Sequence, residues 1–190
     1  AIRAPICFSA WSGRTSLHDK ERTEEKMKHT ISVLVENHSG VLSRVSGLFS
    51  RRGFNIDSLA VGITEDPTIS RMTIVVEGND YTVEQVEKQL NKLIDVIKVR
   101  TIPKEELVTR ELVLFKIQTE ISQRSEVMDL CKIMGAKIID ISRSTLTVEM
   151  TDTAEQIALL EDLLTPYRIL EVARTGLIAV QKGALTINKK

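Results

Sequence analysis

The residues whose types and spacing best suit ligand binding form the turn Asn37–Gly40, with the sequence Asn-His-Ser-Gly. Within residues 31–35 before it, every second residue is apolar and β-branched. The apolar residues between Val41 and Phe49 then repeat at helical spacing until the stop at Gly53. A helix start presents free backbone N–H groups and a positive dipole end, which together suit a small carboxylate. No catalytic acid, base or nucleophile accompanies the turn, so it predicts a sensor.

Three residues around this turn have both a structural and a ligand-binding interpretation. Gly40 fits a plain turn and a bare backbone surface in contact with a ligand equally well. Taken singly, Asn37 and Asn55 are more typical of turns and helix caps. Side-chain amides can pair with both an amino and a carboxylate group, so the combination of all three residues favours a binding site.

The surroundings of the other candidate residues disfavour metal binding and nucleophilic catalysis. His18 lies in an unusual leader, His29 opens a strand and His38 lies in an exposed turn, so the three histidines form no recognisable metal set. Ser39 and Ser43 have no base at a recognisable spacing. We therefore expect no catalytic residue and no metal ligand.

The composition disfavours several classes of protein. With 190 residues, the chain can form one domain or two small ones. Lys plus Arg (26) equals Asp plus Glu (26), and aromatic residues make up only 4%, so neither charge nor base stacking argues for a nucleic-acid partner. No apolar run approaches the ~20 residues of a membrane helix. We expect neither a nucleic-acid nor a membrane partner.

The first 28 residues differ from the rest and are left out of the predicted fold. A plastid transit peptide is conceivable from their arginines and serines, but the acidic residues between Asp19 and Glu25 disfavour it. Cys131 lies at an apolar helical position and predicts a buried free thiol, which fits a reducing compartment. The expected location is the cytoplasm.

The remaining sequence predicts two copies of one plan: strand, helix, strand, strand, helix, strand. This is the ferredoxin-like βαββαβ order, so we expect an α+β protein of two tandem domains at residues 29–103 and 108–182, with a frayed tail over Gly183–Lys190. The first copy has expected strands at 31–35, 54–63, 72–76 and 96–102 and helices at 41–52 and 83–94, the second helix capped by Thr82. The second copy has expected strands at 111–118, 137–141, 145–150 and 169–174 and helices at 124–134 and 154–164.

Only the first copy carries the features of a binding turn. The corresponding turn of the second copy, residues 119–124, has no glycine, and its Glu120 would repel a carboxylate. If one copy binds a small acid, we expect it to be the first.

From about Lys28 to Lys182 the chain resembles the regulatory, or small, subunit of acetohydroxyacid synthase, also called acetolactate synthase. The resemblance covers most of the chain, in order, and implies an N-terminal ACT domain followed by an ACT-like domain. The segments that carry it are Ser32–Asn37, Ser39–Arg44, Gly47–Leu59, Ile69–Ile74, Gln89–Val96, Arg110–Ile117 and Glu171–Gly176.

The resemblance also implies an effector and partners. Such subunits form homodimers whose ACT sheets join side by side, with valine bound between them. They activate a large catalytic subunit in branched-chain amino acid (valine, isoleucine and leucine) biosynthesis and confer feedback inhibition by valine. Thiamine diphosphate, magnesium and FAD belong to that partner, and no cofactor is expected here. The implied valine-binding positions are Asn37, Ser39, Gly40, Val41 and Leu42 of one protomer with Asn55 and Ile56 of the other.

Two considerations bear on the alternatives and on assembly. A free-standing amino-acid sensor or transcription regulator would need a DNA-reading element, and residues 1–28 are too short and too acidic to supply one. Exposed edge strands are costly. Because residues 31–35 and 54–63 are long and apolar, we expect two ACT domains to pair edge to edge in a two-fold dimer.

Overall fold

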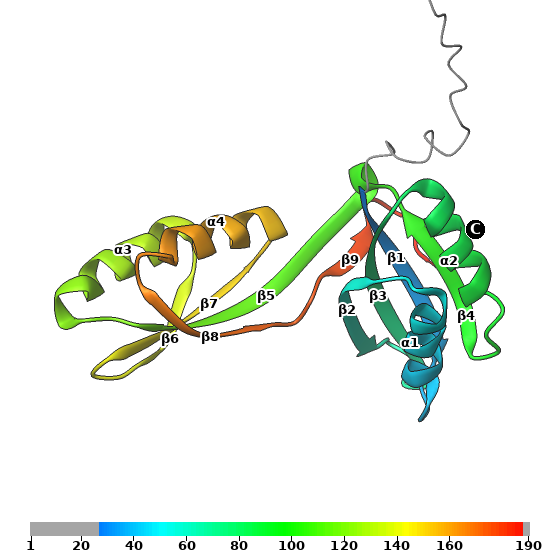
Figure 1. Ribbon diagram of the computed structural model, residues 1–190, viewed down its shortest axis with the longest axis horizontal. Helices are drawn as coiled ribbons and strands as arrows, with labels where there is room; N and C mark the ends of the chain where they lie inside the picture. Colours follow the sequence, from blue (N-terminus) through cyan, green and yellow to red (C-terminus); the bar gives the residue numbers. More distant parts are fainter. Residues whose placement is uncertain (1–26, 188–190) are drawn as a thin grey trace, which may run out of the picture.

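The computed structural model describes residues 27–187, which form two neighbouring domains, each built from one sheet and two helices (Figure 1). The first contains β1 (Met27–Glu36), α1 (Val41–Arg52), β2 (Ile56–Ile63), β3 (Ile69–Gly78), α2 (Asp80–Leu90) and β4 (Val96–Ile102). The second contains β5 (Leu107–Gln118), α3 (Arg124–Met134), β6 (Lys137–Ile141), β7 (Thr145–Asp152), α4 (Ala154–Leu164), β8 (Arg168–Arg174) and β9 (Ile178–Gln181). The predicted α+β fold with two βαββαβ units is confirmed.

Both sheets are antiparallel, with strand orders β2-β3-β1-β4 and β6-β7-β5-β8. β1 pairs along its whole length with β3, from Met27 opposite Gly78 to Glu36 opposite Ile69, and β4 pairs on its other side. The expectation that residues 31–35 form an edge strand is therefore wrong. The edges of the first sheet are β2 and β4, because the chain returns to both sides of its first strand.

Each sheet packs its helices on one face only. In the first domain, every second residue of β1 and β3 packs against α1 and α2 in a core of aliphatic side chains around Phe49. The intervening residues point to the opposite face, which we call the open face. Its side chains include Ser32, Leu34, Arg71 and Arg100, since Leu34 lies opposite Arg71 and Ser32 opposite Arg100. The second domain has its own core around Phe115.

The helix ends are set by local chemistry. Gly53 and Gly135 close α1 and α3 as predicted. Thr82 is not the cap of α2; Asn79 is, because its side chain accepts a hydrogen bond from the backbone N–H of Thr82 at 2.9 Å. α2 ends at Leu90, so Ile94 lies beyond it and is 94% exposed. Among residues 27–187, no helix combines the length and apolar character needed to cross a bilayer.

The thiol predicted in the second domain is also confirmed. Cys131 is a free cysteine buried in α3, and burial raises the pKa of its thiol.

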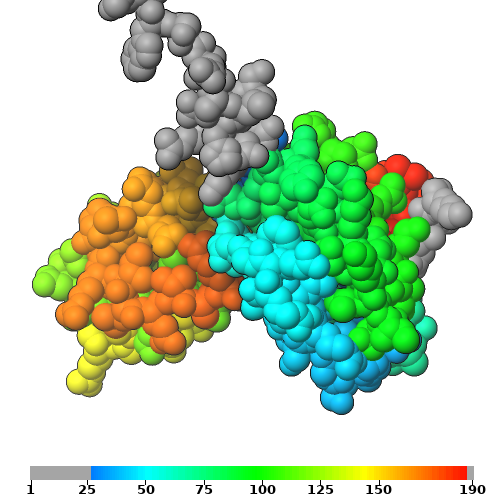
Figure 2. All heavy atoms as spheres, turned by 45° about the vertical axis from the view of Figure 1, so that its right-hand side comes forward, coloured from blue at the N-terminus to red at the C-terminus, as the bar shows by residue number. Residues whose placement is uncertain are grey.

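The last described residues, 176–187, return to the first domain. β9 pairs with the first four residues of β5, and Ala179 and Ile187 are 4% and 7% exposed. The expectation of a frayed tail is therefore wrong for residues 183–187, and residues 188–190 lie outside the described part. We call Gly176–Ile187 the C-terminal strap. Figure 2 shows its red end beside the green residues near 100, on the first lobe.

Three hydrogen bonds hold the C-terminal strap to the first domain. The N–H of Leu177 donates to Ser58 Oγ at 2.9 Å. Arg71 Nη2 donates to the carbonyl of Ala179 at 2.9 Å, and Arg100 Nη1 donates to the carbonyl of Thr186 at 3.0 Å. β5 joins this arrangement to the second domain, because its first residues pair with β9 and its later residues pair with β7 and β8.

Gly176 provides a test of this contact. Its φ is +80°, and a Cβ there would lie 2.8 Å from Ser58 Oγ and 3.3 Å from the backbone oxygen of Leu59. Gly176→Ala should lower the free energy of unfolding by about 2–3 kcal/mol, from backbone strain and from the clash. The measurement is urea unfolding followed by circular dichroism.

Gly183→Ala is the matched control. Gly183 has φ +75°, and no atom of residues 27–187 lies within 4 Å of the position that a Cβ would take there, so only the strain of about 1–2 kcal/mol applies. Equal losses in the two variants would contradict a close contact at Gly176.

Candidate functional site

The start of α1 has the geometry expected of an anion-binding turn. Gly40 is the N-cap, with φ 86° and ψ −14° in the left-handed region that favours glycine. The first helical hydrogen bond runs from Arg44 N–H to Gly40 O at 3.0 Å, so the N–H groups of Val41, Leu42 and Ser43 precede the ladder. Within residues 27–187, no side chain caps this helix, and its first turn holds no acidic residue. Three backbone donors are therefore available to an anion.

The predicted residues of the turn differ in how they meet solvent. Ser39 and Gly40 are exposed, and Leu42 is 46% exposed. Val41 is 3% exposed, with its side chain in the core between α1 and the sheet. Only the backbone N–H of Val41 can thus face a ligand, whereas Leu42 can offer both its N–H and an apolar surface.

Asn37 fixes the turn to the connection between β2 and β3. Its backbone N–H donates to Thr68 O at 2.7 Å, and its Nδ2 donates to Pro67 O at 2.8 Å. Both acceptors belong to the connection between β2 and β3. A hollow of about 500 Å³ lies beside this contact and is lined by Asn37 and His38 but not by Gly40. Asn37 thus has a structural role in addition to any contact with a ligand.

Asn55 and Ile56 are not brought to the turn within one chain. They follow Gly53 at the far end of α1, and Asn55 Nδ2 donates to Asp57 Oδ1 at 3.1 Å. α1 has 12 residues, which gives a length of about 18 Å. A site that uses Gly40 and Asn55 together therefore requires a second copy of the chain.

The equivalent turn of the second domain is already occupied by its own side chains. Glu120 and Gln123 form a capping box, in which the Glu120 side chain accepts from the backbone of Gln123 and Gln123 Oε1 accepts from the N–H of Glu120 at 3.2 Å. An external carboxylate would have to displace Glu120. This difference favours the first domain as the place where an anion binds.

A cluster of charged side chains behind the turn was missed by the sequence analysis. Arg44 donates to both carboxylate oxygens of Asp95, from Nε at 2.6 Å and from Nη2 at 3.0 Å. Asp95 is 6% exposed, and its backbone oxygen accepts from the N–H of Glu36 at 2.9 Å. His38 Nε2 lies 3.2 Å from Asp95 Oδ1 and 3.2 Å from Glu36 Oε2. The cluster ties the start of α1 to the start of β4.

The same cluster brings three potential metal ligands together, which the sequence did not suggest. One ligand atom from each of Glu36, His38 and Asp95 lies within 4.8 Å of the other two. A cation at this point would meet the guanidinium of Arg44, which already uses both oxygens of Asp95. We interpret the cluster as an ion-pair network that positions the turn. In the sequence, Asp95 stands between the apolar residues Ile94 and Val96, and this position was the signal that could have indicated a buried, paired carboxylate.

His38 should report on this network through its titration. The hydrogen bond from its Nδ1 to Ser39 O raises the pKa of His38 above its usual value, and the carboxylates of Asp95 and Glu36 raise it further. The protonated form is therefore the one that the fold favours. Its contribution to stability is fully present below about pH 6.5 and is lost as the pH rises through the raised pKa of His38.

We expect an NMR titration of the His38 ring to give a midpoint above about 6.5, and Glu36→Gln to lower it. The stability difference between the wild type and His38→Gln should shrink as the pH rises through that midpoint. A midpoint at or below 6.5 would show that the contacts to Ser39, Asp95 and Glu36 are not maintained in solution.

Comparisons with known proteins agree with this architecture. Residues 31–98 match the family described as AHAS small subunit-like ACT domain, and residues 110–183 match the family described as small subunit of acetolactate synthase. The crystal structure of an acetolactate synthase small subunit from Thermotoga maritima superimposes with a TM-score of 0.79, at 40% identity, over 84% of this chain and 99% of that chain.

Curated relatives lead to the same family. A probable acetolactate synthase small subunit from Archaeoglobus fulgidus is 52% identical over 164 residues, which cover 86% of this chain and all of that protein. The acetolactate synthase small subunit of Mycolicibacterium smegmatis is 49% identical over 155 residues, covering 82% of this chain and 91% of that protein. The chain therefore belongs to the family of acetolactate synthase small subunits, non-catalytic regulatory subunits that carry an ACT domain.

Proposed function

We propose that this protein activates the large, catalytic subunit of acetolactate synthase and makes its activity sensitive to valine. The observation that carries the proposal is the start of α1, where Gly40 leaves backbone N–H groups of the first helical turn available to an anion. Such a site can bind a carboxylate through backbone donors alone. Binding of this kind, on a chain of a family of regulatory subunits, fits an effector site that acts on another subunit.

Valine is proposed as the ligand, bound between two protomers. Its carboxylate would accept hydrogen bonds from the N–H group of Gly40 and from those of Val41 and Leu42, which are two of the three donors that precede the helical ladder. Ser39 would lie beside it. Asn55 and Ile56 of the second protomer would complete the site, because α1 separates them from Gly40 in one chain. The position of β2 at the sheet edge, with Val61 and Ile63 exposed at 47% and 66%, supports edge-to-edge pairing of two ACT domains.

The chemistry of the reaction is proposed to reside in the partner. Thiamine diphosphate, magnesium and FAD would be bound by the large subunit, and this chain would act in the cytoplasm without a cofactor of its own. Its effect on catalysis would then be allosteric: valine would favour the state of the complex to which it binds more tightly.

Reconstitution tests the function directly. Mixing the purified chain with its catalytic subunit should raise the rate of acetolactate formation, and valine should lower that rate. A matched titration with alanine, which offers the same charged groups and less apolar surface, should inhibit less. If the complex forms, as shown by size-exclusion chromatography, but neither activation nor inhibition is seen, the proposal fails.

Gly40→Asp should abolish valine inhibition while activation remains. A carboxylate about 4 Å from the bound carboxylate costs about 1 kcal/mol in water and about 4 kcal/mol at an effective dielectric of 20, equivalent to roughly 5-fold and roughly 1000-fold in affinity. Gly40→Asn is the matched control, because Asn has the same shape, carries no charge and also tolerates the left-handed region. The difference between the two variants in valine affinity, measured by calorimetry, gives the effect of the charge, reduced by the part that Arg44 neutralises, because a Cβ at position 40 would lie 3.8 Å from Arg44 Nη1. Equal valine sensitivity in Asp and Asn variants would place the ligand elsewhere.

Gly40→Asp, combined with a variant of Asn55, can test whether the site spans two chains. Asn37→Ala and Asn55→Ala should each weaken valine binding by about 1–3 kcal/mol, the value of a hydrogen bond to a charged group. In a mixed dimer of Gly40→Asp with Asn55→Ala, one site is doubly altered and the other is intact. Co-expressed mixed dimers should thus regain half of the valine sites, whereas a site within one chain predicts no recovery.

A further inference from the structure

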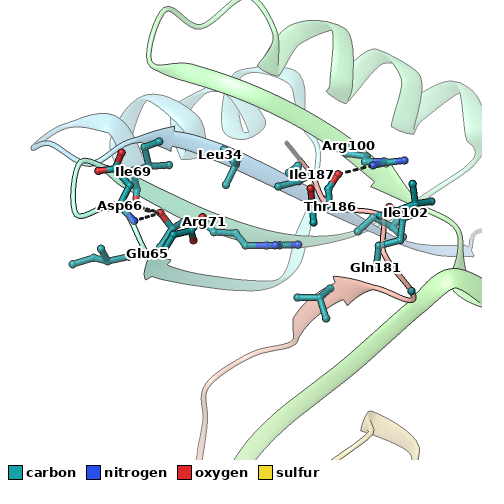
Figure 3. Close-up of a pocket in the computed structure, with 15 residues that line it drawn as sticks. Leu34, Glu65, Asp66, Ile69, Arg71, Arg100, Ile102, Gln181, Thr186 and Ile187 are labelled. Atoms are coloured by element: carbon teal, nitrogen blue, oxygen red, sulfur yellow. Dashed lines mark hydrogen bonds between the residues drawn. The ribbon is translucent and has the colours of Figure 1, made fainter. Parts of the chain in front are cut away.

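A second cavity lies away from the turn, between the open face of the first sheet and the C-terminal strap (Figure 3). Its volume is about 440 Å³, which is within the range of small-molecule sites. Apolar side chains line both sides: Leu34, Ile69 and Ile102 on the sheet, and Leu185 and Ile187 on the strap. The pocket is therefore suited to an apolar body.

Two arginines line this apolar cavity and can pair with a carboxylate. Arg71 is half-buried, and burial lowers the pKa of its guanidinium. Its Nη2 donates to Ala179 O, but its buried Nε has no hydrogen-bond partner among the described residues. Figure 3 shows Arg71 extended along the sheet toward the end of the cavity where Arg100 and Gln181 lie. A buried donor on a cation is costly when it is left unpaired.

The surroundings of the arginines define the charge of a suitable ligand. Glu65 and Asp66 also line the cavity, and Glu65 interacts electrostatically with Arg71. Two nearby carboxylates oppose a multiply charged group such as phosphate, whereas a single carboxylate can pair with the planar donors of a guanidinium. The apolar walls favour a ligand in which that carboxylate is attached to a hydrocarbon group.

We propose that this cavity binds one small monocarboxylate with an apolar body, held by Arg71 and Arg100. The site is separate from the turn at Gly40 and does not depend on the function proposed there. Arg71 and Arg100 each also bind a backbone carbonyl of the C-terminal strap. A ligand that orders the two guanidinium groups therefore also stabilises the strap against the sheet.

The probe is 3-methylbutanoate, titrated into the full chain by calorimetry and by NMR of the arginine Nε–H groups. 3-Methylbutanamide is the neutral probe of the same shape. The acid should bind the wild type and shift the Arg71 Nε–H signal, and the amide should not. Slower hydrogen exchange at the Leu177 N–H with the acid present would report the stabilised strap.

Four variants locate the binding. Arg71→Met should weaken it about 10- to 100-fold, the value of a hydrogen bond to a charged group. Arg71→Lys should lie between wild type and Arg71→Met, because it keeps the charge but not the planar fork. Arg110→Met removes an arginine that lies outside this cavity and should leave the affinity within about 2-fold of the wild type. Gly40→Asp removes any binding of the acid at the turn of α1, so the binding that remains in this variant reports on the cavity alone.

Each other outcome would overturn the proposal. Unchanged binding in Arg71→Met, or equal binding of the amide, would remove the role of the charge. Loss of binding in Gly40→Asp with retention in Arg71→Met would assign the acid to the turn of α1. Tighter binding of inorganic phosphate than of 3-methylbutanoate would show that charge alone, and not the apolar body, selects the ligand.

Discussion

A sheet that carries helices on one face must cover its other face wherever that face is apolar. The open face of the first domain meets this requirement. With the cover in place, Ser32, Leu34 and Ile102 on this face are at most 4% exposed. The cover comes from the C-terminal strap, which the chain supplies only after completing the second domain. On the equivalent face of the second sheet, Lys116 and Gln118 are exposed, so no segment among residues 27–187 covers them. The long β5, the added β9 and the cavity under the strap all follow from this asymmetry.

The candidate turn depends on parts of the chain far from it in sequence. Its residues could be predicted because a strand, a glycine and an apolar helix face follow one another locally. The ion pair between Arg44 and Asp95 could not, because 51 positions separate its members and only the sheet order brings them together. The assignment of Asn55 to a second protomer came from the family resemblance, and the length of α1 agrees with it. With Asn37 anchored to the β2–β3 connection, the donors of the turn are held in place before a ligand arrives, which lowers the entropy cost of binding.

The sequence predicted the fold well where the signals are local. α3, α4 and β4 have the predicted boundaries, because glycine, proline and β-branched residues act within a few positions. The prediction of the start of α2 was wrong because Asn79 and Thr82 are both residue types that cap helices. In the structure Asn79 is the cap, and its side chain accepts a hydrogen bond from the backbone N–H of Thr82. The prediction also failed for β9 and residues 183–187. Their pairing with β5 and packing on the open face depend on tertiary contacts that leave no periodic pattern in so short a segment.

The C-terminal strap has a consequence for biosynthesis. A ribosome makes the first sheet early and its cover later, with about 70 residues between Ile102 and Gly176. At about 5–20 residues per second, the open face waits roughly 4–15 s for the strap. During this interval Leu34 and Ile102 present apolar surface next to newly formed strands. The first sheet therefore completes its packing only after the second domain has been synthesised, and we expect the nascent first domain to expose apolar surface until then.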